Sequence, residues 1–264
     1  MCLIGIAWKA HPDFPLIVAA NRDEFHARAT APSGWWEAAP QLLSGRDLQS
    51  GGTWMGVTRG GRFAALTNFR GAGQVDPGAP SRGELVSAFL DAAVLPAHYL
   101  AALDTDAARF NGFNLLAGTP EQLWYYGNRG GVLRQLPTGI YGLSNALLDT
   151  PWPKVNALKS AMGAALRQIK PQDPPPSTVS SLVQRLFDAL VDTRPGPDAA
   201  LPQTGLARDR ERLLSSTMIV SPDYGTRAST ALCVSRNGDV FWEERSLAPD
   251  GAVSRIVRES FRLA

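Results

Sequence analysis

Short apolar runs separated by turn residues dominate both ends of the chain. Residues 3–10 and 16–20 are largely apolar, each run is short enough for a buried strand, and a proline-rich turn separates them. Near the other end, residues 216–220, 229–235 and 240–244 have strand character, and an Asn-Gly pair typical of a tight hairpin lies between the last two. We therefore expect antiparallel strands at both ends of the chain.

The region that follows the first strands continues this pattern. Val57 and residues 63–67 flank Arg59–Arg62, in which glycine supplies the positive φ that a hairpin turn needs. Residues 113–117 and 122–126 also have strand character, and the aromatic side chains of the second segment predict either a sheet face or a pocket wall.

Four segments space their apolar residues at helical intervals. Ser81 and the pair Asp149 and Thr150 are expected to cap two of these helices, and Pro151 and Pro153 suit a first helical turn. The predicted helices are residues 81–93, part of 97–106, 154–169 and 180–191.

Three stretches are rich in residues that interrupt regular structure. The stretch through Trp35 and Trp36 to residues 44–47 is expected to be irregular, and its tryptophans either line a pocket or cap the core. Residues 170–177 predict a stiff, proline-rich connector, and residues 192–206 predict a long loop.

The order of the predicted elements is strands, helices and then strands. This order predicts an α+β fold with antiparallel pairing rather than a parallel βαβ sheet. With 264 residues, of which 44% are hydrophobic and 19% charged, the chain can bury a substantial core. We expect a single domain over residues 1–264.

Charge and cysteine content argue against several classes of protein. A formal net charge of +2 is too small to predict binding to nucleic acid or to an anionic membrane. Cys2 and Cys233 imply no disulfide framework and favour a reducing, cytoplasmic location. The chain shows neither a signal peptide nor a run of about 18 apolar residues, so we expect no membrane span. The histidines lie far apart, so no metal site is predicted.

The candidate chemistry lies at the beginning of the chain. If Met1 is removed, Cys2 becomes the first residue and carries a nucleophilic thiol beside an α-amine, which can act as the base because its reference pKa is ~8. The predicted hairpin brings the polar segment Asn21–Glu24 back beside Cys2. The alternatives are that Cys2 is a small apolar strand residue and that Asn21–Glu24 is only a polar turn.

A series of motifs extends this pattern over nearly the whole chain. They are Cys2, NRDE at 21–24, GGTWMG at 51–56, LTNFRG at 66–71, NGFNLL at 111–116, GLSNALLDTPWPKV at 142–155 and YGTRASTAL at 224–232. Together and in this order they resemble the NRDE family, which includes the transport and Golgi organisation protein 2 group. The combination is far more specific than any single motif.

The NRDE family is in turn similar to the cysteine type of N-terminal nucleophile (Ntn) hydrolases, which includes bile salt hydrolase, penicillin V acylase and acid ceramidase. The resemblance implies a four-layer αββα sandwich of two antiparallel sheets packed face to face. It implies Cys2 as the nucleophile, Asp23 as the residue that holds the α-amine, and Arg227 beside the thiol, where its charge favours the thiolate. Asn145 and the backbone around Asn68 would stabilise the oxyanion.

One position departs from the hydrolase pattern. Those enzymes usually have an arginine three residues before the aspartate, whereas Ala20 occupies that position here and the arginine is Arg22. Neighbouring side chains on a strand point to opposite faces, so the sequence leaves the role of Arg22 open.

Two classes of function follow from the resemblance. In the first, Cys2 cleaves a small acyl amide or thioester and passes the acyl group to water or an amine, with no cofactor required. In the second, the protein binds haem or acyl-CoA without catalysis, as the family's association with haem handling and lipid metabolism implies. Haem would need an axial ligand, for which Cys2, His26 and His98 are the candidates. Arginines would suit the phosphates of acyl-CoA. The candidate binding residues are Asn21, Arg22, Glu24, Arg46, Trp54 and Arg70.

Overall fold

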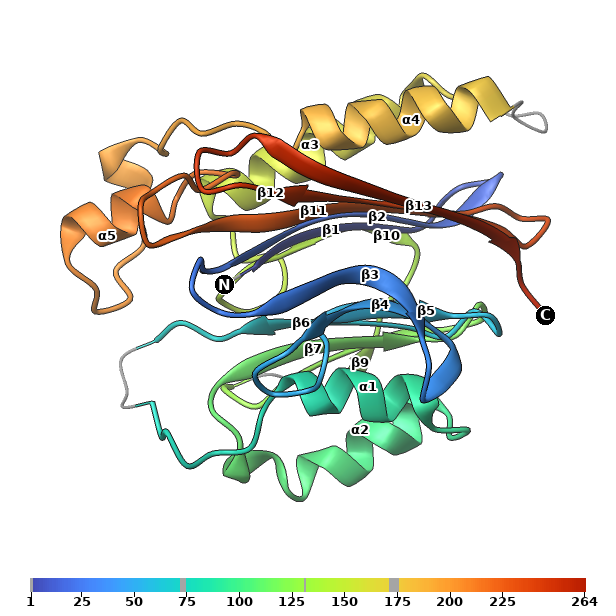
Figure 1. Ribbon diagram of the computed structural model, residues 1–264, viewed down its shortest axis with the longest axis horizontal. Coiled ribbons are helices and arrows are strands. Elements are labelled where there is room, and N and C mark those ends of the chain that lie inside the picture. The colour runs from blue at the N-terminus through green and yellow to red at the C-terminus, as the bar shows by residue number, and fades with distance from the viewer. Residues whose placement is uncertain (1, 72–74, 131, 171–175) are drawn as a thin grey trace. The chain divides into compact units, whose positions relative to one another are not determined.

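The computed structural model describes residues 2–71, 75–130, 132–170 and 176–264. The chain forms two compact units, each built from segments that are distant in the sequence (Figure 1). The first unit comprises Met1–Ala27, Thr138–Ser144 and Asp149–Phe261, and the second comprises Arg28–Pro137, Asn145–Leu148 and Arg262–Ala264. That residues 1–264 act as a single domain stays a prediction.

The first unit contains a six-stranded sheet in the order β10-β1-β2-β11-β12-β13. Strands β1 and β2 occupy central positions and are buried over most of their length, as their continuous apolar runs predict. The strands are β1 (Cys2–His11), β2 (Phe14–Phe25), β10 (Gly139–Leu143), β11 (Tyr224–Val234), β12 (Asp239–Leu247) and β13 (Val253–Arg262).

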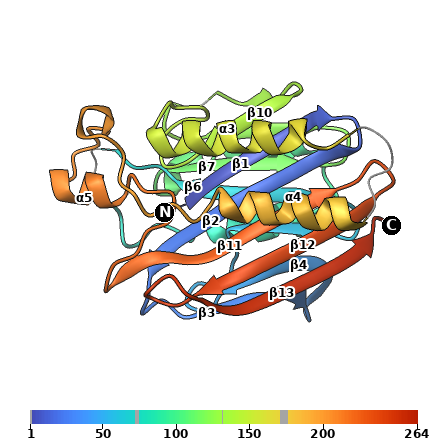
Figure 2. The ribbon, with the colours of Figure 1, turned by 90° about the horizontal axis from the view of Figure 1, so that it is seen from above.

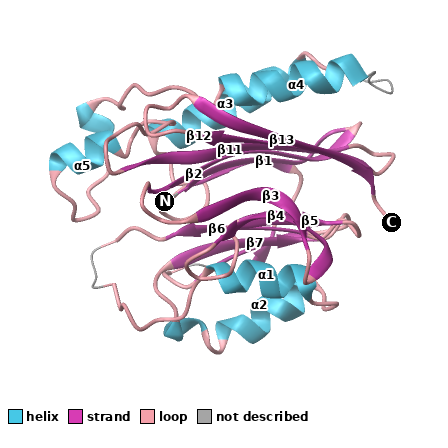
Figure 3. Cartoon of the chain, in the orientation of Figure 1, coloured by secondary structure: helices cyan, strands magenta, loops and turns pink. Residues whose placement is uncertain are grey.

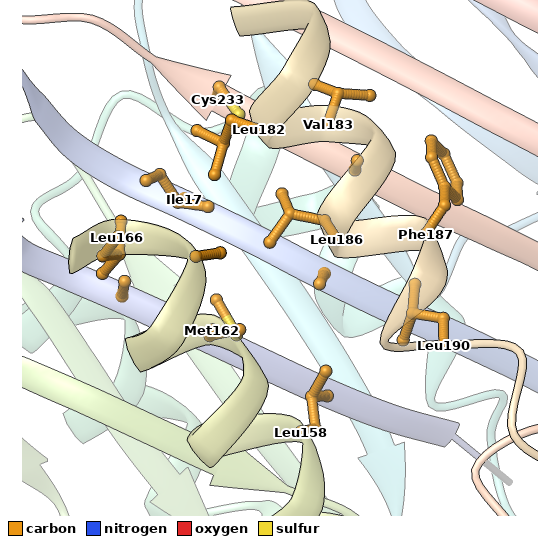
Figure 4. Packing of buried hydrophobic residues seen from close by; sticks show 14 of the residues in the cluster. Ile17, Leu158, Met162, Leu166, Leu182, Val183, Leu186, Phe187, Leu190 and Cys233 are labelled. Carbon is orange, nitrogen blue, oxygen red and sulfur yellow. The ribbon is translucent and has the colours of Figure 1, made fainter. Parts of the chain in front are cut away.

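Helices α3 (Pro153–Arg167) and α4 (Pro176–Asp188) cover one face of this sheet (Figure 2). On α3, the apolar residues Leu158, Met162 and Leu166 recur every four residues and so form a stripe toward the strands. Figure 4 shows these side chains packed with those of α4 over Ile17 and Cys233 of the sheet. Each fully buried aliphatic side chain contributes about 1.5–3 kcal/mol relative to exposure, so this face holds the first unit together.

The second unit contains a seven-stranded sheet in the order β3-β4-β5-β6-β7-β8-β9. Helices α1 (Gly83–Asp91) and α2 (Pro96–Asp104) pack against it (Figure 3) and share a core with its strands that includes Phe89, Leu100 and Leu115. The strands are β3 (Thr30–Trp36), β4 (Ala39–Asp47), β5 (Met55–Thr58), β6 (Phe63–Asn68), β7 (Phe113–Gly118), β8 (Leu123–Gly127) and β9 (Arg134–Gln135).

Two sheets with antiparallel pairing, each with its own helices, confirm the predicted α+β class. Both predicted glycine turns are also confirmed. Gly61 has a φ of 78° in the turn between β5 and β6, and Gly238 has a φ of 84° in the turn between β11 and β12. Positive φ strains residues that carry a side chain, so glycine suits both positions.

The prediction of an irregular stretch around Trp35 and Trp36 was wrong. Both tryptophans lie in β3, which pairs with β4. Register shifts interrupt this pairing at two places, so the apolar residues do not alternate regularly and the strand period is hidden in the sequence. The guanidinium groups of Arg59 and Arg46 stack on Trp35 and Trp36, at 3.7 and 4.7 Å from the ring centroids.

Residues 216–220 were predicted as a strand and are irregular instead. Of their apolar side chains, Ile219 is buried in the loop that precedes β11, whereas Val220 is exposed, so a short apolar run without strand pairing produced the strand-like pattern. Strand β13 and the short helix α5 (Arg208–Leu213) were not predicted. Polar residues interrupt β13 and leave most of it exposed, which removes the apolar signal.

The predicted side-chain caps were also wrong. Helix α1 begins after Arg82 and α3 begins after Trp152, and neither has a side-chain cap. Asp149 instead accepts a hydrogen bond from the backbone N–H of Gly142 at 2.8 Å and pairs with Lys159 at 2.7 Å. Pro153 does begin α3, as predicted.

The predicted connector at residues 170–177 lies largely outside the described residues, and the predicted loop at 192–206 is confirmed apart from a short 3-10 turn. Among the described residues, no helix combines the length and the apolar composition that crossing a membrane requires.

Candidate functional site

Cys2 is the first residue of β1 and lies directly opposite Arg22 of β2. Its neighbour Leu3 belongs to the core beneath α3 and α4. Because successive side chains of a strand alternate, Cys2 points to the face of the sheet that these helices do not cover. Residues directly opposite each other in antiparallel strands share a face, so the Arg22 side chain lies on the same face as the thiol.

The Cys2 thiol is buried and therefore difficult to ionise. Burial raises its pKa to about 11, the negative charge of Asp23 adds to this effect, and the positive charge of Arg22 opposes it. The Ser144 hydroxyl donates a hydrogen bond to the Cys2 carbonyl oxygen at 3.0 Å, which fixes the backbone there. With Met1 in place, Cys2 is thus a neutral thiol near pH 7, and reaction through sulfur requires a base.

Asp23 lies on the other face of β2 and is 1% exposed. Its Oδ1 accepts a hydrogen bond from the Thr226 hydroxyl at 2.7 Å, and that hydroxyl oxygen accepts one from the backbone N–H of Ile219 at 2.9 Å. Burial raises the pKa of the Asp23 carboxyl, while the positive charge of Lys154 lowers it. Lys154 is itself buried and donates to the Leu214 carbonyl at 2.9 Å. The Thr226 hydroxyl therefore donates to the carboxyl, and the positive charge of buried Lys154 favours its ionised form.

A β-bulge positions Arg227. Thr226 is paired with Asp23 and Ala228 with Arg22, so Arg227 is an extra residue on β11 with no counterpart on β2. Bulges redirect a side chain relative to the regular alternation of a strand. The Arg227 guanidinium donates to the carbonyl oxygens of Phe25 and His26 at 3.0 and 3.1 Å.

Two arginines act on each other at this end of the sheet. Burial lowers the pKa of Arg227, and the positive charge of Arg22 lowers it further, whereas the charge of Glu24 raises it. Arg22 also lies 3.8 Å from a carboxylate oxygen of Glu24. The structure thus brings Cys2, Arg22, Glu24 and Arg227 to one end of the sheet.

Three further residues in this region were missed by sequence analysis. Tyr224 is buried against Phe25, with ring centroids 5.2 Å apart, and burial together with the charges of Asp23 and Cys2 raises the pKa of its hydroxyl. Thr226 and Lys154 are the partners of Asp23 described above. All three lie in motifs that were recognised, but burial and contact with Asp23 come from tertiary packing, which the motifs do not show.

Asn21 was predicted to bind a ligand, and its side chain is fully occupied within the protein. Its amide donates to the carbonyl oxygens of Leu190 and Thr217, both at 2.9 Å, and its oxygen accepts from the Ser229 hydroxyl at 2.6 Å. The side chain is completely buried. Asn21 therefore ties β2 to the segment after α4 and to the loop before β11.

The two asparagines expected to stabilise an oxyanion lie in the second unit. The Asn145 amide donates to the Asn68 carbonyl at 2.9 Å, and the Asn145 carbonyl accepts from the Arg70 backbone N–H at 2.6 Å. Nearby, Asn114 donates to the Thr67 hydroxyl and to the Ala146 carbonyl. These bonds hold residues 145–148 in the second unit, directly after Ser144, where the chain leaves the first unit.

The remaining candidates are dispersed. Arg46 and Trp54 lie in the second unit, where Arg46 donates to the Gly51 carbonyl at 3.1 Å and Trp54 is partly exposed. His98 is exposed on α2 in that unit. His26 uses Nε2 in a 3.0 Å hydrogen bond with the Ser221 carbonyl, which ties it to the loop before β11.

Haem binding and acyl-CoA binding stay predictions. Over the residues described, no three or more His, Cys, Asp or Glu side chains gather in a metal-binding arrangement.

The residues that match known proteins include all the candidate site residues. The family model described as Transport and Golgi organisation 2 matches residues 1–249. Transport and Golgi organization protein 2 homologs from Bos taurus and Homo sapiens are each 36% identical to this chain; the alignments cover 100% and 94% of this chain and 99% and 93% of those proteins.

Among solved structures, penicillin V acylase from Agrobacterium tumefaciens aligns with 95% of this chain and 93% of its own, at 11% identity and a TM-score of 0.48. A mutant conjugated bile acid hydrolase from Clostridium perfringens aligns with 98% of this chain and 92% of its own, at 10% identity and a TM-score of 0.46.

Proposed function

The chain belongs to the Transport and Golgi organisation 2 family, as its motifs indicated, and we propose that it hydrolyses or transfers an acyl group by means of Cys2. The observation that carries this proposal is the pairing of β1 with β2. Cys2 lies opposite Arg22, and the same register continued by one residue reaches Asp23. Once Met1 is removed, the α-amine of Cys2 would therefore lie beside the Asp23 end of β2.

This arrangement supports a division of roles between the two faces of the sheet. On one face, Arg22 supplies positive charge opposite the thiol and favours the thiolate, and Arg227 acts on Arg22 at the same end of the sheet. On the other, Asp23 is held by Thr226 and balanced by Lys154, so it can orient the α-amine. A thiol whose pKa burial raises to about 11 needs a local base, and the freed α-amine is the nearest one.

The proposed reaction proceeds through a thioester. The α-amine takes the thiol proton as Sγ attacks the acyl carbon. The proton then passes to the departing amine or thiol, the bond to that group breaks, and the acyl group remains on sulfur. Water or an amine attacks the thioester, loses a proton and releases the acyl product, and the thiol is restored. Every step uses groups of this chain, the acyl substrate and the water or amine that accepts the acyl group.

The experiment that tests this proposal compares three forms of the protein on a panel of acyl amides and acyl thioesters. The first is the Met1-free chain, the second carries an N-terminal extension that keeps the thiol and removes the free α-amine, and the third is Cys2→Ser. Intact mass establishes the terminus of each. We expect turnover by the first form and a loss of roughly 100-fold or more in the other two. A Met1-free protein that is inert across the panel, or an extended form that is equally active, overturns the proposal.

A further inference from the structure

A cavity of about 660 Å³ lies at the other end of the six-stranded sheet. The β1–β2 and β11–β12 hairpins, the beginning of α4 and the end of β13 surround it, and Figure 2 shows these elements at the same end of the sheet. Its volume is within the range of small-molecule sites, roughly 300–1,000 Å³. Strand β1 runs ten residues from Cys2 to this end, so the cavity is about 30 Å from the thiol at ~3.3 Å per residue.

The interior of this cavity is apolar. Phe14 and Val240 contribute buried side chains, and Val179, Phe241 and Phe261 contribute partly exposed ones. Three of these five side chains are aromatic, which gives large contact areas for an apolar group. An apolar ligand body would be removed from water here at a gain of about 25 cal/mol per Å² buried.

The rim of the cavity carries a cation in a fixed position. Arg236 is half-exposed, and its guanidinium lies 3.5 Å from the carboxylate of Asp13, which is 3% exposed. The Arg236 backbone N–H also donates to the Asp13 carbonyl at 2.9 Å, so the two hairpins are joined at this point. The Asp13 carboxylate also lies 4.0 Å from Nδ1 of His11, and its ion pair with Arg236 places the guanidinium at the cavity mouth.

We propose that this cavity binds a small amphipathic carboxylate, with its apolar chain inside the cavity and its carboxylate at Arg236. A guanidinium presents five N–H donors in a planar fork that suits a carboxylate. This site is separate from Cys2 and goes beyond the proposed acyl chemistry. The rim also includes Asp239, whose negative charge would oppose an anionic head group. The experiment therefore compares an anionic ligand with a neutral one.

The test measures binding of decanoate and of neutral decanol to the full chain by isothermal titration. Cys2→Ser protein is used throughout, so that acyl chemistry at the thiol plays no part. We expect saturable decanoate binding that Arg236→Gln weakens about tenfold, because the charged hydrogen-bond donor for the carboxylate is lost, and we expect decanol binding to change less than about twofold. Arg255→Gln, on exposed β13, is the matched control and is expected to bind decanoate as the parent does.

A second variant keeps the proposal testable if Arg236→Gln does not fold. Val179→Trp enlarges a partly exposed side chain of the cavity wall and is expected to abolish binding of both ligands, whereas Ser181→Trp, at an exposed position of the same helix, leaves it intact. Absence of saturable decanoate binding, unchanged binding in Val179→Trp, or an equal loss of decanol and decanoate in Arg236→Gln would overturn the proposal.

Discussion

The two ends of the six-stranded sheet each contain a buried cysteine, and their surroundings differ in kind. Burial alone raises the pKa of Cys233 to about 12, and the thiol packs under α4 among apolar residues. At the other end, burial raises the pKa of Cys2 to about 11, and the charges of Asp23 and Arg22 act on it as well. Burial is therefore common to both thiols, and charged neighbours distinguish the candidate nucleophile from the packing residue.

The largest expected effect is on the rate of thiol alkylation, whose dependence on pH should differ between Cys2 and Cys233. The thiolate is the reactive form, so a raised pKa lowers the rate near pH 7, and the rate then increases about tenfold per pH unit until the pKa is reached. With an N-terminal extension, Cys2 should follow this increase toward its pKa of about 11. In the Met1-free chain we expect the profile to level near the α-amine pKa of ~8, with a rate roughly 100-fold higher at pH 7.5.

Iodoacetamide labelling with peptide mapping measures both cysteines in one sample. Cys233 is the internal reference, because burial raises its pKa and its position in β11, away from the N-terminus, does not change between the two forms. Coincident Cys2 profiles for the extended and the Met1-free chains would contradict the role assigned to the α-amine.

Thr226→Val should reduce stability at the Cys2 end. The substitution removes the donor to Asp23 Oδ1 and the acceptor for the Ile219 N–H, so we expect the free energy of unfolding to fall by about 1–3 kcal/mol. Denaturant unfolding measures this change. Thr105→Val, at an exposed side chain in the second unit, should change it by less than about 0.5 kcal/mol.

The loss of stability in Thr226→Val should also depend on pH. The Thr226 hydrogen bond lowers the pKa of Asp23, so its loss should raise that pKa further above the unfolded value. A carboxyl with a raised folded pKa binds more protons in the folded state, so its effect on stability becomes less favourable as pH rises from the unfolded to the folded pKa. The deficit of Thr226→Val should therefore be smaller at pH 4 than at pH 7. An equal deficit at both would argue against this linkage.

Arg22→Gln is expected to have the smallest of these effects. Loss of the positive charge opposite Cys2 should raise the thiol pKa, and the alkylation rate of the Met1-free chain near neutral pH should fall by up to about tenfold. Arg22→Lys retains the charge and should lose less. Arg46→Gln in the second unit is the matched control, and an equal loss there would show that the effect is not local.

The sequence predicted the elements whose signals are local. Gly61 and Gly238 mark their hairpins because a positive φ favours glycine, and the apolar runs of β1 and β2 identify central strands. Strand β3 was missed because bulges disturb its alternation, and residues 216–220 were mistaken for a strand because their apolar run lies in a loop that buries Ile219 without strand pairing.

The candidate site was predictable to the extent that it depends on motif positions. The resemblance to the NRDE family indicated Cys2, Asp23 and Arg227. It did not reveal that a bulge makes Arg227 the extra residue on β11, nor that Lys154 and Thr226 act on Asp23, because these relations depend on register and tertiary packing. Asn21 shows the converse. It is a polar residue of a recognised motif, but its side chain makes hydrogen bonds to other residues of the protein and so stabilises the fold.

The most direct test of the role of Cys2 is mass spectrometry of the acylated protein under single-turnover conditions. The untagged protein is mixed with an acyl thioester that it turns over, quenched in acid and digested, and the N-terminal peptide is sequenced by fragmentation. We predict one acyl group on Cys2 of a peptide that begins at that residue, and no adduct in Cys2→Ala. An adduct at another residue, or full activity in protein that retains Met1 on every chain, would contradict Cys2 as a self-activated nucleophile.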